Sequence, residues 1–257
     1  MPHVLVFDSG IGGTSVLSHL QLAMPMAQYT YVMDNKLLPY GLQSQETIKG
    51  RLVALLDWIK QSKKQVDVIV IACNTASTYA LETARMHTTI PIVGVVPAIK
   101  PAARASVKKH IGLLATPATS KNTYTANLIS AFAKDCQVEI YHSTQLVSIA
   151  EHFYWHKEIQ SNQLKAELER LNVSNKLDRL VLGCTHFPII REQLQKYLSQ
   201  EIGLVDSGEA IARRVQHILS YNVKKDKCNE VGPVHWYATA PDNLEKSADI
   251  SLLKLVN

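Results

Sequence analysis

The chain has 257 residues, a formal net charge of +5 and a hydrophobic share of 46%. This length suits one large α/β domain or two small ones, and the composition is that of an ordinary globular enzyme. No apolar stretch is long enough to span a bilayer, and no basic stripe alternates with aromatic residues, so we expect neither membrane nor nucleic-acid binding. Because the first residues lack the pattern of a secretory signal, we expect a cytoplasmic protein.

Strand-like aliphatic runs alternate with helix-like runs along the chain. The expected strands cover residues 4–7, 29–33, 66–72, 92–95, 110–115, 137–141, 177–182, 204–205 and 234–238. The expected helices cover residues 14–22, 45–61, 75–86, 121–133, 163–171, 189–198, 208–219 and 244–255. Because the strands are continuously apolar and helices separate them, the pattern predicts parallel sheets covered on both faces.

The alternation begins again after the proline-containing segment 97–101, which predicts an α/β fold of two similar parallel-sheet domains. The first domain would comprise residues 1–97 together with 208–257, and the second residues 98–207. No linker-like stretch separates them, so we expect a tight interface with the active site in a cleft between the domains. Ligands of open parallel sheets bind at the carboxyl ends of strands, so polar residues at those ends are the candidate site residues.

Two segments with the same pattern end one expected strand in each domain: residues 70–75 and 181–186. Each is an aliphatic run followed by a small residue, a cysteine (Cys73 or Cys184) and polar side chains. A free thiol has a pKa near 8.5, and the N-terminus of a following helix would stabilise its thiolate. The pair predicts two bases that face one substrate carbon.

The other two cysteines, Cys136 and Cys228, have no polar company and are interpreted as small buried hydrophobes. Cys184 with His186 alone would suit a nucleophilic hydrolase, an alternative that leaves Cys73 unexplained. No further ligands stand at zinc-site spacing, so we expect no metal.

Residues 8–13 (Asp-Ser-Gly-Ile-Gly-Gly) follow the first strand, open a helix and partly match a dinucleotide-binding fingerprint, with Asp34 where a ribose-binding acid would lie. The third glycine is replaced by Ser15, and the Asp8 carboxylate would face the pyrophosphate. We therefore expect Asp8 and Ser9 to point into the cleft while the glycines let the backbone approach a small anion. The alternative is that Asp8 only caps the following helix.

Five segments together closely resemble the glutamate racemase family. They are residues 8–13, 39–41 (Pro-Tyr-Gly), 72–76 (Ala-Cys-Asn-Thr-Ala), 115–119 (Ala-Thr-Pro-Ala-Thr) and 183–188 (Gly-Cys-Thr-His-Phe-Pro). The resemblance implies a cofactor-independent enzyme that interconverts L- and D-glutamate for peptidoglycan synthesis. The wider aspartate/glutamate racemase group shares both cysteine motifs, so aspartate or another acid stays an alternative substrate. A binding protein that has lost turnover is an alternative from another class.

By this resemblance, Cys73 and Cys184 are the catalytic acid/bases on opposite faces of the α-carbon. Asp8 would assist Cys73, His186 would assist Cys184, and Glu151 matches a family acid near the active site. Substrate contacts would come from Asp8, Ser9, Tyr40, Gly41, Asn74, Thr75, Thr116, Thr119, Thr185 and His186. We expect no cofactor, glutamate as the small-molecule partner, and a homodimer.

Overall fold

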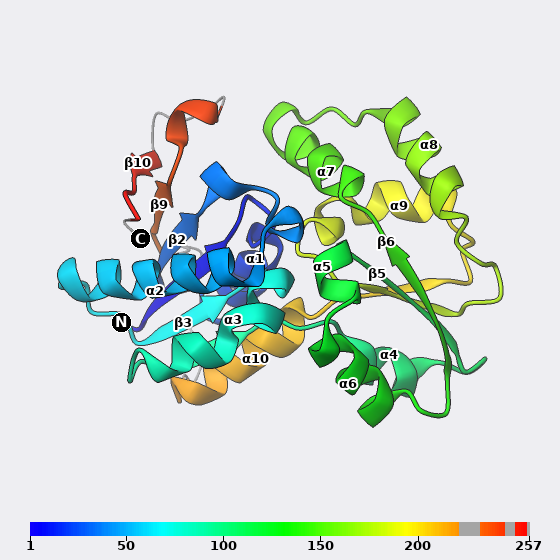
Figure 1. The fold of residues 1–257 in the computed structure, drawn as a ribbon, viewed down its shortest axis with the longest axis horizontal. Coiled ribbons are helices and arrows are strands. Elements are labelled where there is room, and N and C mark those ends of the chain that lie inside the picture. Colours follow the sequence, from blue (N-terminus) through cyan, green and yellow to red (C-terminus); the bar gives the residue numbers. More distant parts are fainter. Residues whose placement is uncertain (221–231, 245–249, 256–257) are drawn as a thin grey trace. The chain divides into compact units, whose positions relative to one another are not determined.

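The computed structural model describes residues 1–220, 232–244 and 250–255. The chain divides into two compact units: Met1–Val95 with Gly208–Asn257, called unit 1, and Val96–Ser207, called unit 2. Each unit is a parallel sheet whose strands are joined by helices (Figure 1). The expected fold class, α/β with two parallel sheets, is confirmed.

Among the described residues, the sheet of unit 1 has the strand order β10-β9-β2-β1-β3-β4, and all neighbours are parallel. The strands are β1 (His3–Asp8), β2 (Gln28–Met33), β3 (Val68–Ile71), β4 (Ile92–Gly94), β9 (Val234–Ala238) and β10 (Ile250–Leu252). β1 lies between β2 and β3, and its residues 4–7 are fully buried. A continuous aliphatic run suits this central position because both faces of the strand are covered.

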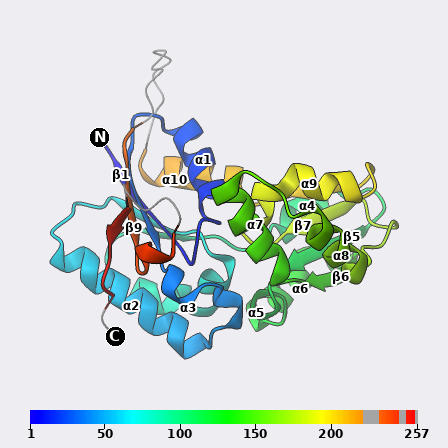
Figure 2. The same ribbon diagram turned by 90° about the horizontal axis from the view of Figure 1, so that it is seen from above.

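Helices cover both faces of this sheet, with α2 and α3 on one face and α1 and α10 on the other (Figure 2). The helices are α1 (Thr14–Ala23), α2 (Gln45–Gln61), α3 (Asn74–Met86) and α10 (Gly208–Ile218). Alternate residues of β1 and β3 pack under α2 and α3, as the two-residue period of a strand requires: Leu5, Phe7, Ile69 and Ile71. Short 3-10 turns at Asn35–Leu37 (η1), Tyr40–Leu42 (η2) and Pro241–Asn243 (η4) follow β2 and β9.

In unit 2 the described residues form a sheet with the order β6-β5-β7-β8, again parallel throughout. Its strands are β5 (His110–Ala115), β6 (Gln137–His142), β7 (Arg179–Leu182) and β8 (Gly203–Val205). The helical segments are α4 (Ile99–Ala105), α5 (Pro117–Ser120), α6 (Thr123–Phe132), α7 (Gln145–His156), α8 (Ser161–Leu171), the 3-10 turn η3 (Phe187–Ile190) and α9 (Arg191–Tyr197). α4 and α6 share a core with β5, and α7, α8 and α9 lie on the other side of the sheet (Figure 1).

The C-terminal segment differs from the expected helix over residues 244–255. Residues 245–249 lie outside the described part of the chain, Ile250–Leu252 form β10, and residues 253–255 are not helical. β10 pairs in parallel with β9, so an available sheet edge outweighs the weak helical pattern of a short apolar run. The expectation for Cys228 also falls outside the described residues.

α4 occupies the segment after Pro97, where the sequence predicts only a domain boundary. No helix in the described ranges is long and apolar enough to cross a membrane.

Candidate active site

In unit 1, Cys73 lies at the carboxyl edge of the sheet, between the end of β3 and the start of α3. It is the N-cap residue of this thirteen-residue helix and is only 6% exposed. The N-terminal end of a helix carries a partial positive charge, which stabilises a negative charge placed there. Asn74 and Thr75 are the first two residues of α3 and are buried beside Cys73, as the sequence predicts for this motif.

Asp8 and Ser9 lie near Cys73 because β1 and β3 are neighbours. Asp8 is the last residue of β1, and its Oδ1 accepts hydrogen bonds from the Gly10 amide at 3.0 Å and the Ser9 hydroxyl at 3.4 Å. The Ser9 Oγ lies 4.0 Å from the Cys73 Sγ. The N-cap of α1 is Gly13, so Asp8 does not cap that helix. The Ser9 hydroxyl thus lies within reach of both the Asp8 carboxylate and the Cys73 thiol.

The Tyr40 side chain is turned into the protein. It is 1% exposed, and its hydroxyl donates to the Asp34 Oδ2 at 2.6 Å. Burial, and then the charge of Asp34, raises the pKa of Tyr40 well above its ordinary value of 10.0, so the hydroxyl keeps its proton. A ligand contact from this loop would therefore come from the backbone of Tyr40 and Gly41. Asp34 is itself fully buried and paired with Arg51, which is inconsistent with a ribose-binding acid.

In unit 2, Cys184 follows β7 and lies beside a hydrogen-bonded pair of side chains. The His186 Nδ1 is 3.8 Å from the Cys184 Sγ, and the His186 Nε2 is 2.7 Å from the Glu151 Oε1. Glu151 projects from the middle of α7, and its Oε2 accepts a hydrogen bond from the Trp155 indole at 3.2 Å. Cys184, Thr185 and His186 are all buried.

The charge state of His186 depends on these contacts. Burial lowers the pKa of His186, but the hydrogen bonds with Cys184 and Glu151, and the negative charges of both, outweigh it. The pKa therefore lies well above the ordinary value of 6.5, and the ring carries both protons near neutral pH. In this state Nε2–H donates to Glu151 and Nδ1–H points to the sulfur of Cys184, so a proton and a positive charge are held beside that sulfur.

The two thiols precede different helical elements. Cys73 begins a long helix, whereas Cys184 precedes the four-residue 3-10 turn η3, and α9 starts only at Arg191. The expectation of a helix N-terminus at Cys184 is thus met only by one short turn, with Pro188 in its first positions. Cys184 has His186 as its main source of positive charge, and Cys73 has the helix.

Thr116 and Thr119 lie at the carboxyl end of β5, the strand next to β7. Thr116 caps α5, and its hydroxyl lies 3.1 Å from the Thr119 hydroxyl. Both residues are buried, at 4% and 0% exposure. Unit 2 therefore gathers Thr116, Thr119, Thr185 and His186 at the same sheet edge as Cys184.

Sequence reasoning missed three residues: Arg51, which pairs with Asp34, Thr239, which also contacts Asp34, and Trp155, which contacts Glu151. Only Arg51 had a visible signal, because it falls on the apolar face of α2 among Ile48, Leu52 and Leu55. A charged residue on such a face indicates a buried partner.

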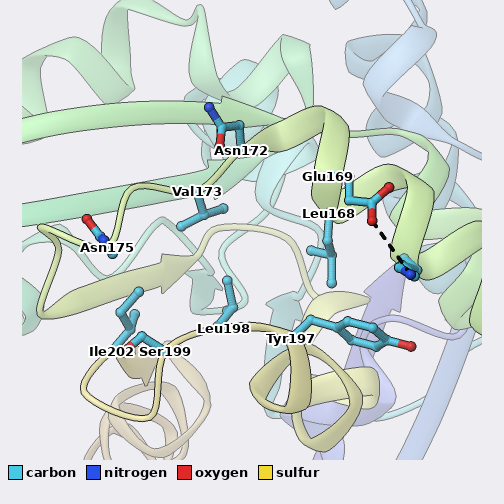
Figure 3. Close-up of a pocket in the computed structure, with 10 residues that line it drawn as sticks. Leu168, Glu169, Asn172, Val173, Asn175, Tyr197, Leu198, Ser199 and Ile202 are labelled. Carbon is cyan, nitrogen blue, oxygen red and sulfur yellow. Dashed lines mark ion pairs between the residues drawn. The ribbon is translucent and has the colours of Figure 1, made fainter.

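Two hollows lie away from these residues. One, of about 510 Å³, is enclosed by the end of α8, the end of α9 and the loops that lead into β7 and β8; Leu168, Tyr197 and Leu198 point into it (Figure 3). The other, of about 780 Å³, lies in unit 1 where α2 and α3 end. Both are at the amino edges of the sheets, whereas Cys73 and Cys184 are at the carboxyl edges, so neither hollow belongs to the candidate site.

Several known proteins are similar to this chain. The Asp/Glu/Hydantoin racemase family model matches residues 14–215. Glutamate racemase of Shewanella denitrificans is 50% identical over 217 residues, which cover 84% of this chain and 77% of the relative. Glutamate racemase of Vibrio vulnificus is 48% identical over 219 residues, covering 85% and 81%. The crystal structure of Escherichia coli glutamate racemase in complex with L-glutamate and the activator UDP-MurNAc-Ala is similar over 100% of this chain and 99% of that one, with 37% identity and a TM-score of 0.87.

Proposed function

We propose a two-cysteine mechanism for this chain, which belongs to the glutamate racemases of the Asp/Glu/Hydantoin racemase family. Such an enzyme is an isomerase that interconverts L- and D-glutamate. We infer that Cys73 and Cys184 are its two acid/bases. The observation that carries this inference is that each unit places one buried thiol at the carboxyl edge of its sheet, each with its own source of positive charge.

In each turnover, the thiolate of one cysteine removes the α-proton of glutamate, and the thiol of the other donates a proton to the opposite face. The enzyme is left with the two protonation states exchanged, so the reverse reaction uses the same groups in opposite roles. His186 holds a proton beside Cys184, and Asp8 and Ser9 assist proton transfer at Cys73. Racemisation by this route requires the two thiols to face opposite sides of one α-carbon.

Glutamate brings two carboxylates and an ammonium group, and the buried polar residues at the two edges match these groups. Hydroxyl and amide donors from Ser9, Thr75, Thr116 and Thr185, and the backbone of the Tyr40–Gly41 loop, suit the carboxylates. A carbanion next to a carboxylate gains stability when fixed donors face the developing charge in a site from which water is excluded. We propose that these donors supply that stabilisation and that the reaction needs no cofactor.

The proposed role is to supply D-glutamate for peptidoglycan synthesis in the cytoplasm. Free thiols at Cys73, Cys136 and Cys184 among the described residues suit a reducing compartment. A homodimer stays a prediction, which light scattering on the purified protein tests directly.

Conservative cysteine variants test the mechanism. We expect Cys73→Ser and Cys184→Ser each to lower racemisation by at least about 100-fold, because an acid/base of the wrong acidity replaces the thiol at nearly the same size. Chiral chromatography of glutamate, with aspartate as a competing substrate, provides the assay. Cys136→Ser is the matched control, since this thiol lies outside both groups and should leave the rate unchanged. A folded Cys73→Ser or Cys184→Ser protein with undiminished activity would exclude the two-base model.

A further inference from the structure

We propose that Arg51 is a positioning residue for the substrate loop of unit 1: through Asp34 it holds the Pro39–Tyr40–Gly41 backbone in the place where that loop contacts glutamate. This inference rests on the proposed function, because the resemblance alone assigns substrate contact to Tyr40 and Gly41. Arg51 itself lies on α2 and would not touch the substrate.

The centre of the arrangement is the Asp34 carboxylate, which is fully buried just after β2. Arg51 binds it with both arms of the guanidinium, Nε to Oδ2 at 2.7 Å and Nη2 to Oδ1 at 2.8 Å. The Tyr40 hydroxyl donates to Oδ2 at 2.6 Å, and the Thr239 hydroxyl donates to Oδ1 at 2.7 Å. A charged acceptor shared by four short hydrogen bonds makes a rigid unit.

This unit joins segments that are far apart in the chain. Arg51 also donates from Nη1 to the Leu255 carbonyl at 3.0 Å, and Thr239 follows β9, so the C-terminal strands are tied to the same carboxylate. The Asp34 amide in turn donates to the Asp8 carbonyl at 2.9 Å. The loop is therefore held in a fixed position relative to β1, which ends at Asp8. The same strand places Ser9 beside Cys73.

The side chain of Tyr40 serves as the attachment point of the loop. Its hydroxyl donates a hydrogen bond to Asp34. Its ring packs near that of Phe7, with the ring centroids 6.2 Å apart. The η2 turn at Tyr40–Leu42 then continues with amide-to-carbonyl bonds from Leu42 to Pro39 and from Gln43 to Tyr40. Fixing the Tyr40 hydroxyl thus fixes the peptide units that precede and follow it.

The Arg51–Asp34 ion pair needs both of its hydrogen bonds because the two side chains are buried. The side chain of Arg51 is 7% exposed and that of Asp34 is 0% exposed. A lysine at position 51 would keep the charge but could not reproduce the planar two-bonded contact and the bond to Leu255 together. The Pro39–Tyr40–Gly41 loop would then no longer be held in one position through Asp34, although an ion pair between residues 34 and 51 would remain.

Substrate affinity distinguishes positioning from plain stabilisation. A loop that binds glutamate equally in the ground and transition states affects KM, whereas the thiols control kcat. We expect Arg51→Lys and Tyr40→Phe each to raise KM for glutamate by about 10-fold, with kcat changed by less than about 3-fold. The matched controls are Arg170→Lys, which alters a bidentate pair with Glu167 in unit 2, and Tyr29→Phe, which removes a buried hydroxyl bonded to Leu20 and Met24 in unit 1. Both controls should leave KM unchanged.

Hydrogen exchange separates failure of this inference from failure of the proposed function. In Arg51→Lys and in Tyr40→Phe, the amides of Leu42 and Gln43 should exchange faster than in the wild type, while the β2 amides keep their protection. If the loop amides loosen but the wild-type protein does not racemise glutamate, the proposed function fails and the anchoring stands. If the loop amides are unaffected, or if KM rises equally in the controls, or if kcat alone falls, Arg51 is not a positioning residue.

Discussion

Replacing Glu151 with glutamine probes the proton supply of Cys184. Glutamine has almost the same shape and can still accept the Trp155 indole hydrogen bond, but it carries no charge to face His186. The contact it alters is a 2.7 Å hydrogen bond between side chains that are 2% and 14% exposed. The perturbation is therefore confined to the electrostatics of one buried pair.

A hydrogen bond to a charged partner contributes about 1.5–3 kcal/mol when it is buried. This interaction favours the protonated ring, so its loss lowers the pKa of His186 in the variant relative to the wild type. If the proton on His186 serves Cys184 in the rate-limiting transfer, the same free energy corresponds to a loss of about 10- to 150-fold in kcat. The loss should grow as the pH rises, because the variant gives up the imidazolium proton earlier.

The raised pKa of His186 also makes the stability of the protein depend on pH. A histidine whose pKa is raised by folding stabilises the protein fully below its unfolded pKa, about 6.5, and this contribution is lost as the pH rises through the folded value. The difference in unfolding free energy between wild type and Glu151→Gln should therefore shrink from neutral to alkaline pH. Urea unfolding at several pH values measures it.

The assay is the pH profile of racemisation, with the His186 ring titrated by NMR in parallel. Glu139→Gln is the matched control, because Glu139 forms a comparable pair with His110, at 2.6 Å, in the same unit. We expect the alkaline limb of the profile to move to lower pH in Glu151→Gln only. An unchanged profile, or an equal loss in Glu139→Gln, would refute the role assigned to the Glu151–His186 pair.

Two further predictions concern backbone approach and a buried carboxylate. A Cβ on Gly13 would lie 2.8 Å from the Tyr31 hydroxyl and 3.0 Å from the Asp8 Cβ. Gly13→Ala should therefore lower the free energy of unfolding in urea by about 1–3 kcal/mol, and should lower activity by displacing Asp8. Full activity at wild-type stability would contradict this. Burial raises the pKa of Asp178, but the Ser106 hydroxyl and two backbone amides outweigh it and hold the pKa below 3.8. Asp178→Asn should therefore lose about 1.5–3 kcal/mol at neutral pH, a difference that vanishes as the pH falls through the native pKa and that acid-dependent unfolding measures.

The predictable part of the molecule is the part governed by local pattern. Fully apolar runs such as residues 4–7 and 68–71 are central parallel strands, and Cys73 and Cys184 follow strands in both units, because the end of an aliphatic run fixes the end of a strand. That residues 8 and 186 lie near these thiols could also be inferred, since each is close in sequence to a strand end, and their roles in catalysis stay predictions.

Contacts between distant segments could not be predicted. Thr239 reaches Asp34, and the Leu255 carbonyl reaches Arg51, only because the strand order places β9 beside β2, and no local pattern encodes that order. The sequence predicts a helix where β10 is found, because the pairing of β10 with β9 is a tertiary contact that no local pattern encodes. The side-chain direction of Tyr40, turned toward Asp34, is likewise a result of packing.

The isotopic content of early product tests the two-base account most directly. Wild-type protein is incubated with L-glutamate in D2O, with no added cofactor, and the reaction is stopped within the first few per cent of conversion. We expect D-glutamate that carries deuterium at the α-carbon while the remaining L-glutamate keeps its proton, because the donating thiol exchanges with solvent and differs from the accepting one. D-glutamate that retains the original proton would show a single base returning it to the opposite face, and would contradict the account.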